Sequence, residues 1–150
     1  DIGFGILGFF AILPAVACVA LLVHLFLWLL NMPVETQPAI QIFLTEQTAG
    51  ILFFWLFLAV VLAPLVEEVL FRGILLPVLT QKIKILPALA LTALIFAAAH
   101  FHLPTLLPLF VLALGLGLAY ILSGSLLPSI VMHVLFNALN LLLLWSQIKL

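Results

Sequence analysis

Long apolar runs separated by short polar segments dominate this chain. A helix needs about 20 apolar residues to cross the hydrocarbon core of a bilayer, and five runs come close to that length. These runs cover residues 4–30, 49–79, 87–101, 104–122 and 128–145. The third run is short for a span. The pattern therefore predicts an all-α protein, a polytopic bundle of about five transmembrane helices.

The second run, residues 49–79, is longer than a bilayer core requires. As a straight helix it would extend roughly 46 Å, against a core of about 30 Å. Proline interrupts helices because it lacks a backbone N–H. We therefore expect a break at Pro77 or near Gly73, with residues 74–86 lying along the membrane interface.

The composition agrees with a membrane location. Hydrophobic residues make up 68% of the chain and charged residues 6%, whereas soluble domains are about 45–50% apolar and about 25% charged. The formal net charge is −1 and no basic run occurs, so nothing indicates a nucleic-acid partner. The single cysteine, Cys18, excludes an internal disulfide framework and a cysteine-based metal site.

The few charged residues outside the apolar runs predict an orientation. Segment 31–48 is polar and acidic, whereas segment 80–86 contains Lys82 and Lys84. The positive-inside rule places the lysine segment in the cytoplasm, although Lys149 argues for the opposite orientation. The chain begins with Asp1 rather than Met, so further helices can precede it.

A cluster of charges stands inside the second apolar run. The chain has four basic and five acidic residues, and three of these nine are Glu67, Glu68 and Arg72. Each charge placed near the middle of a membrane helix costs about 2.5–3.5 kcal/mol. A helix that served only as an anchor would carry leucine there. The cluster therefore indicates a functional site.

The spacing within this cluster suggests different roles for its members. Glu68 and Arg72 are four residues apart, so they share a helix face and can pair. Arg72 is always protonated and would hold Glu68 in its ionised form. Glu67 points about 100° away from that face. It is the freer carboxylate, which suits a general base.

Polar side chains recur in the third and fifth runs. His100 could share the base role or orient a water. His133 and Asn137 are four residues apart and can aim at one point, as donors that stabilise an oxyanion. An isolated polar pair, histidine or asparagine in a span is often only a packing device. Their joint occurrence in three of the runs favours a catalytic site.

Three short sequences carry a resemblance to a known family. EEVLFR at 67–72, FAAAH at 96–100 and HVLFN at 133–137 resemble the signature motifs of the CAAX protease and bacteriocin-processing (CPBP, or Abi) membrane proteases. Type II CAAX prenyl endopeptidases are members of that family. The resemblance covers about residues 49–145. It divides the chain into an N-terminal helix and polar loop, residues 1–48, and a catalytic membrane core, residues 49–150.

The resemblance implies an intramembrane endopeptidase. In such an enzyme Glu67 and His100 would activate the attacking water, and His133 and Asn137 would stabilise the oxyanion. The pair of Glu68 and Arg72 would support Glu67. The expected partners are a peptide or protein substrate, with prenylated CAAX-type tails and leader peptides both open, and membrane lipid. The site is expected toward the cytoplasmic side.

The resemblance leaves metal use open, because the family has been described both as metalloproteases and as metal-independent glutamate proteases. Glu67, His100 and His133 form a His₂Glu set that zinc accepts, although the chain lacks an HExxH motif. The Asn137 and Arg72 partners suit oxyanion and carboxylate control. We therefore expect no required cofactor, with zinc as the alternative.

Two other interpretations of the chain compete with a protease. A transporter or proton relay would string polar groups across the whole membrane depth and usually has paired halves, whereas these polar residues cluster. A non-catalytic scaffold would be expected to have lost a motif residue, whereas all three motifs are complete here.

The glycines of GFGILG at 3–8 match GxGxxG but follow no strand, so they predict close helix packing instead of nucleotide binding.

Overall fold

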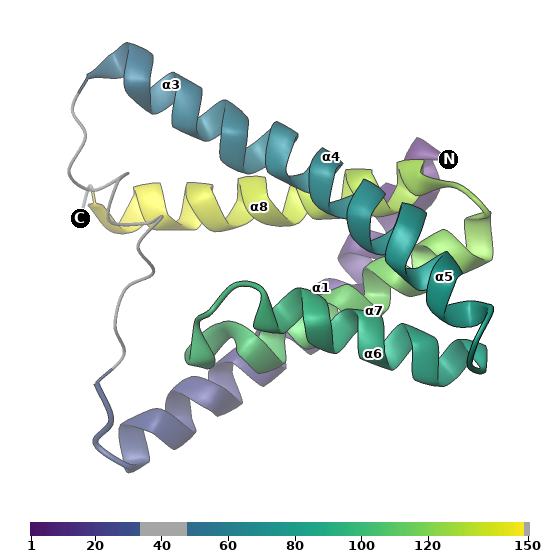
Figure 1. Cartoon of the computed structure of the whole chain (residues 1–150). Coiled ribbons are helices and arrows are strands. Elements are labelled where there is room, and N and C mark those ends of the chain that lie inside the picture. The colour runs from purple at the N-terminus through teal and green to yellow at the C-terminus, as the bar shows by residue number, and fades with distance from the viewer. Residues whose placement is uncertain (34–47, 149–150) are drawn as a thin grey trace.

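The structure is a computed structural model that describes residues 1–33 and 48–148. These residues form helices and turns with no strand, which confirms the all-α prediction (Figure 1). The elements are α1 (Ile2–Leu29), α3 (Ala49–Phe57), η1 (Leu58–Leu62), α4 (Ala63–Glu68), η2 (Val69–Leu75), α5 (Leu76–Thr80), α6 (Ile85–Ala98), α7 (Leu103–Ser123) and α8 (Leu126–Ile148). The five elements from α3 to α5 form one continuous helix, Ala49–Thr80.

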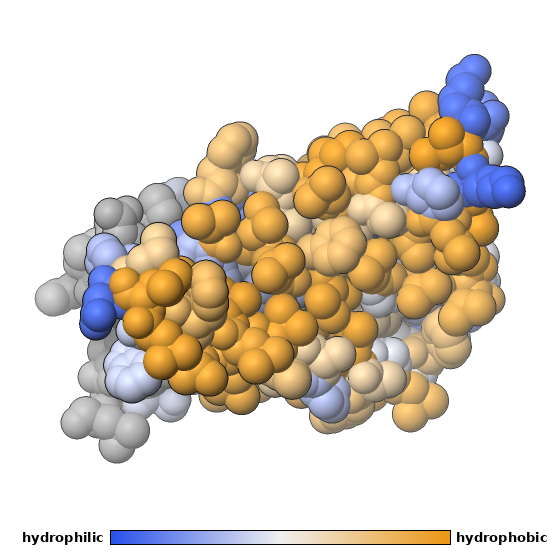
Figure 2. Space-filling view, turned by 90° about the horizontal axis from the view of Figure 1, so that it is seen from below, coloured by the Kyte–Doolittle hydropathy of each residue, from blue (hydrophilic) through white to orange (hydrophobic). Residues whose placement is uncertain are grey.

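Four of the described helices are long and apolar enough to cross a membrane: α1, the continuous helix Ala49–Thr80, α7 and α8. The fifth, α6, has 14 residues and is shorter than a span, as its sequence predicted. Figure 2 shows one face of the molecule covered with hydrophobic residues, while the most hydrophilic ones gather at the two ends. This distribution is that of an integral membrane helix bundle.

The core forms where α1, α7 and α8 pack together. Phe9 and Val16 from α1, Leu112 and Leu116 from α7, and Met132 from α8 are all buried there. By contrast, α3 buries no residue, and Figure 1 shows it diverging from α8. The continuous helix is therefore held mainly by its later part, which carries the charged cluster.

The predicted break at Pro77 or Gly73 is wrong, because the helix continues to Thr80. Residues 74–80 belong to this helix, and α6 begins soon after, at Ile85. The prediction failed because it assumed that proline must end or sharply kink a helix. Here the helix widens locally instead.

Two π-helical turns explain how the helix accommodates its prolines. In the first, Ala63 donates its N–H to the carbonyl of Leu58, five residues back, and the next residue is Pro64. The second turn repeats this arrangement: Leu76 donates to Phe71, directly before the second proline. Single π turns of this kind are often found at functional sites.

Small residues at the start of α1 allow it to approach α8 closely. A Cβ atom added at Gly5 would lie 2.8 Å from the carbonyl oxygen of Pro128 and 2.8 Å from the Cβ of Val131. A Cβ at Gly8 would lie 2.7 Å from the sulfur of Met132. Two of the three glycines therefore serve the close packing that the sequence predicted.

We expect Gly5→Ala to lower the melting temperature of the detergent-solubilised protein by several degrees. Its added methyl would meet backbone and a Cβ atom that cannot turn aside, and overpacking of this kind costs about 1–3 kcal/mol. Gly3→Ala is the matched control, since no atom of residues 1–33 or 48–148 lies within 4 Å of its added Cβ. Equal shifts for the two variants would contradict this account of α1 docking.

Candidate active site

Glu68 lies at the centre of the polar cluster and is fully buried. Its Oε1 accepts a hydrogen bond from Nη1 of Arg72 at 2.7 Å and another from Nδ1 of His133 at 2.7 Å. The predicted ion pair between Glu68 and Arg72 is therefore present. Arg72 is also buried, and its Nη2 donates to the carbonyl of Ala113 on α7 at 3.0 Å. The pair thus joins the charged helix to both α7 and α8.

The contact with Glu68 fixes the orientation of the His133 ring. An ionised carboxylate only accepts hydrogen bonds, so Nδ1 of His133 carries the proton in this contact. The other ring nitrogen, Nε2, then lies 3.7 Å from Oε2 of Glu67. Glu67 keeps 29% of its side chain exposed, whereas His133 is buried. The sequence did not reveal the bond between Glu68 and His133, because it joins residues 65 positions apart.

Phe96 packs against several members of the cluster and is fully buried. Its ring centroid lies 5.0 Å from that of His100 and 5.6 Å from that of His133. The guanidinium carbon of Arg72 lies 4.8 Å from the same centroid. Phe96 opens the FAAAH motif, and its spacing of four residues before His100 was the signal in the sequence that the two side chains lie close together.

His100 is exposed and lies two residues beyond the end of α6, and its ring bonds back to that helix. Its Nδ1 donates to the carbonyl of Phe96 at 2.9 Å, which leaves Nε2 with a free lone pair as an acceptor. Within the described ranges, no hydrogen bond or ion pair joins His100 to Glu67. The structure thus brings Glu67 into contact with His133, while His100 reaches the cluster through Phe96.

Asn137 follows His133 by one turn on α8. Its Nδ2 donates to the backbone carbonyl of Ala59 in η1 at 2.8 Å. One of its two amide N–H groups is therefore committed to the continuous helix. The second N–H and the side-chain carbonyl oxygen are the other hydrogen-bonding groups of this side chain.

Several buried side-chain polar atoms in the bundle have hydrogen-bonding capacity to spare. In the part of the chain that the structure describes, Oε2 of Glu67, Oε2 of Glu68, Nε of Arg72 and Oγ1 of Thr92 have no hydrogen-bond partner. Buried polar atoms are normally paired. Three of these atoms belong to Glu67, Glu68 and Arg72, so the cluster has hydrogen-bonding capacity that its own members do not use.

The geometry can be compared with the needs of a catalytic zinc ion. Such an ion takes three protein ligands at about 2 Å. No three His, Cys, Asp or Glu side chains among residues 1–33 and 48–148 are grouped to hold a metal ion. In the alternative set, Glu67 and His133 are close, whereas His100 contacts the Phe96 ring and bonds to a backbone carbonyl. As placed, these residues do not fit a three-ligand site.

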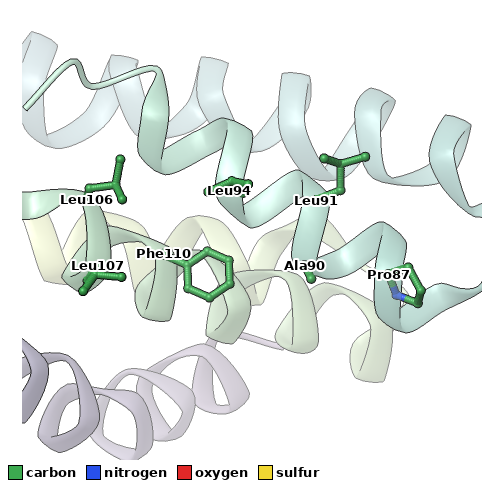
Figure 3. Close-up of a pocket in the computed structure, with 7 residues that line it drawn as sticks. All are labelled: Pro87, Ala90, Leu91, Leu94, Leu106, Leu107 and Phe110. Atoms are coloured by element: carbon green, nitrogen blue, oxygen red, sulfur yellow. The ribbon is translucent and has the colours of Figure 1, made fainter. Parts of the chain in front are cut away.

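An apolar groove lies elsewhere on the surface, between α6 and α7 (Figure 3). It is lined by Pro87, Ala90, Leu91, Leu94, Leu106, Leu107 and Phe110. Leu94 stands two residues before Phe96, which puts it on roughly the opposite face of α6 at about 100° per residue. None of the residues that line the groove belongs to the polar cluster.

Comparison with known proteins identifies the family. The family model described as "Type II CAAX prenyl endopeptidase Rce1-like" matches residues 48–139, more than half of the chain. The chain belongs to the Rce1-like family. The matched region runs from the start of α3 into α8 and contains all three sequence motifs, so the family predicted from those motifs is confirmed.

One curated relative of this Rce1-like chain is an uncharacterized 24.3 kDa protein of Escherichia coli. The two are 43% identical over 88 residues, which cover 55% of this chain and 40% of the relative. The chain thus spans less than half of the length of that protein. No solved structure matches the chain.

Proposed function

We propose that this protein is an intramembrane endopeptidase that hydrolyses a peptide bond with a water activated by Glu67 and His100. The observation that carries the proposal is the 3.7 Å approach of Nε2 of His133 to Oε2 of Glu67, inside a bundle of membrane helices. A carboxylate and an imidazole at one point can activate water and stabilise the charge that its attack creates. Membership of the Rce1-like family supports this chemistry.

In the proposed reaction, Glu67 takes a proton from water while the water oxygen bonds to the carbonyl carbon of the substrate. The imidazole of His100, whose Nε2 is free to accept, orients the same water. The carbonyl oxygen becomes an oxyanion in the tetrahedral intermediate. The C–N bond then breaks, and Glu67 returns its proton to the leaving amine nitrogen. The products are a carboxylic acid and an amine, and the carboxylate of Glu67 is regenerated.

His133 and Asn137 are the proposed oxyanion donors. With protons on both ring nitrogens, His133 donates to Glu68 through Nδ1 and to the oxyanion through Nε2. The second amide N–H of Asn137, the one not used by Ala59, provides another donor. Donors fixed before the reaction stabilise developing charge without reorganising. The pair of Glu68 and Arg72 supports this arrangement by holding the His133 ring.

The proposed substrates are membrane-associated peptides. The family description names a prenyl endopeptidase, which favours prenylated CAAX-type tails, and leader peptides are the other class. Figure 1 places the turn between α5 and α6, with Lys82 and Lys84, at the same end of the bundle as the start of α8. His133 lies seven residues into α8, about 10 Å from that end. The positive-inside rule therefore supports a site on the cytoplasmic side.

The test offers the purified protein in nanodiscs a pool of matched prenylated and plain peptides in H₂¹⁸O. Mass spectrometry would identify the products. Hydrolysis should place one ¹⁸O atom in each new C-terminal carboxylate, and a preference for the prenylated member of each pair would assign the substrate class. Failure to cleave any peptide of the pool, with the protein folded, would contradict the proposal.

We also propose that the reaction needs no metal, because Glu67 and His100 would activate the water without one. Incubation with 1,10-phenanthroline should therefore leave the cleavage rate within about twofold of the untreated protein, because the described residues offer no three-ligand site. The rate of peptide cleavage would be measured without the chelator, with it, and again after zinc is added. Loss of activity that zinc restores would contradict the metal-free mechanism.

A further inference from the structure

The bonding pattern of the first π turn leaves the carbonyl of Ala59 without its expected donor. In a π turn each carbonyl accepts from the N–H five residues later. Ala63 already donates to Leu58, and the next bond in this series would join residue 64 to Ala59. That residue is Pro64, which has no N–H. The sequence of the continuous helix therefore creates a free acceptor in the first π turn.

The side chain of Asn137 supplies the missing donor from another helix. Its Nδ2 lies 2.8 Å from the Ala59 oxygen, although the two residues are 78 positions apart. The bond joins η1 to α8. In the chain η1 directly follows α3, the segment whose far end lies away from α8 in Figure 1. An unpaired carbonyl inside a membrane is costly, so this bond fixes how the two helices meet.

The position of this bond relates it to the active-site cluster. Asn137 and His133 are four residues apart on one face of α8, and Pro64 is three residues before Glu67. A shift of the π turn along or around α8 would move Glu67 relative to His133. Such a shift would change the 3.7 Å distance between Nε2 of His133 and Oε2 of Glu67.

We propose that Pro64 and Asn137 are a matched pair of positioning residues. Because Pro64 has no N–H, the Ala59 carbonyl has no backbone donor, and the side chain of Asn137 donates to it instead. The resulting bond holds the helix of Glu67 in place against the helix of His133. The amide of Asn137 thus has two tasks, one toward the backbone and one toward the substrate. The first task rests on the geometry alone, and only the second rests on the proposed function.

The first test is a thermal double-mutant cycle in detergent, which needs no substrate. Asn137→Ala should lower the melting temperature by about 3 °C, since it removes an interhelical hydrogen bond. In the Pro64→Ala background the same change should cause less than half of that drop, because the N–H of the new alanine can serve Ala59. Asn140→Ala is the matched control, since Asn140 is exposed on α8 and, among the described residues, bonds only to Phe136 of its own helix, at 2.8 Å. An equal drop with proline or alanine at position 64 would overturn the proposal.

A second pair of variants serves if Pro64→Ala does not fold. Asn137→Asp keeps the size of the side chain but removes the N–H donor and faces a carbonyl oxygen with an acceptor. It should lower the melting temperature by more than Asn140→Asp, which places the same carboxylate at an exposed position of α8. Equal effects of the two aspartates would count against the proposal.

Kinetic measurements distinguish a positioning role of this bond from a role in packing alone. With the prenylated and plain peptide pool, Asn137→Ala should lower kcat more than it raises KM, and adding Pro64→Ala should raise kcat again severalfold at constant KM. Recovery should be partial, because the donor to the oxyanion is still missing. A recovered melting temperature without any recovery of kcat would overturn the positioning role. Failure of the proposed function would appear differently, as no cleavage by the wild-type protein, and the thermal cycle would still test the pair.

Discussion

Replacing Glu67 by Gln is expected to slow peptide hydrolysis by about 10²–10⁴-fold, the usual contribution of a general base, while the protein stays folded. The amide keeps the shape of the side chain but cannot take the proton of the attacking water. The fold should survive because Glu67 is partly exposed and approaches His133 only to 3.7 Å. The measurement compares kcat on the best-cleaved peptide of the pool with the melting temperature of each protein.

Val66→Ala provides the control for this substitution. Val66 is the preceding residue on the same helix and is 49% exposed, so its change should leave the rate within about twofold. Retention of more than a tenth of the wild-type rate by the Glu67→Gln variant would show that Glu67 is not the base.

Replacing Arg72 by Met is expected to destabilise the protein by about 3–5 kcal/mol, the usual consequence of removing one partner of a buried ion pair. The change would leave Glu68 fully buried with one of its two donors gone, and would release the carbonyl of Ala113 as well. Methionine keeps much of the arginine volume, so the effect comes from charge and hydrogen bonding. Unfolding of the purified protein by increasing SDS in mixed micelles would measure the loss.

The double variant with Glu68→Gln tests the cause of that loss. Removing the carboxylate charge should make the Arg72→Met change less harmful, so the double variant should lose less than the sum of the two single losses. A strictly additive result, or a loss below about 1 kcal/mol for Arg72→Met alone, would contradict the role of this pair in holding the helices together.

Local patterns in the sequence predicted much of this structure. Hydrophobic run lengths gave the order and type of the described helices, and the spacing of four residues gave the pair of Glu68 and Arg72. Both are properties of a single helix, which depend on nearby residues alone. The family also followed from short motifs, each contained in one run.

Contacts between distant segments could not be predicted in the same way. Nothing local indicates that Glu68 meets His133, or that the Phe96 ring would contact both imidazoles. The π turns were missed because a proline marks a missing N–H without saying whether the helix breaks or widens. The acidic segment 31–48 and Lys149 both bear on the membrane orientation. Residues 34–47 and Lys149 lie outside the described residues, so the membrane orientation and the division at residue 48 stay predictions.

The experiment that decides whether Glu67 and His133 act together on one peptide bond is a kinetic double-mutant cycle. It compares the wild type with Glu67→Gln, His133→Gln and the double variant under single-turnover conditions on one peptide. Residues that act as a unit give grossly non-additive losses. If the two side chains form one catalytic site, the double variant should be about as slow as the slower single variant. Losses that multiply would show that the two residues work independently, and would contradict the site described here.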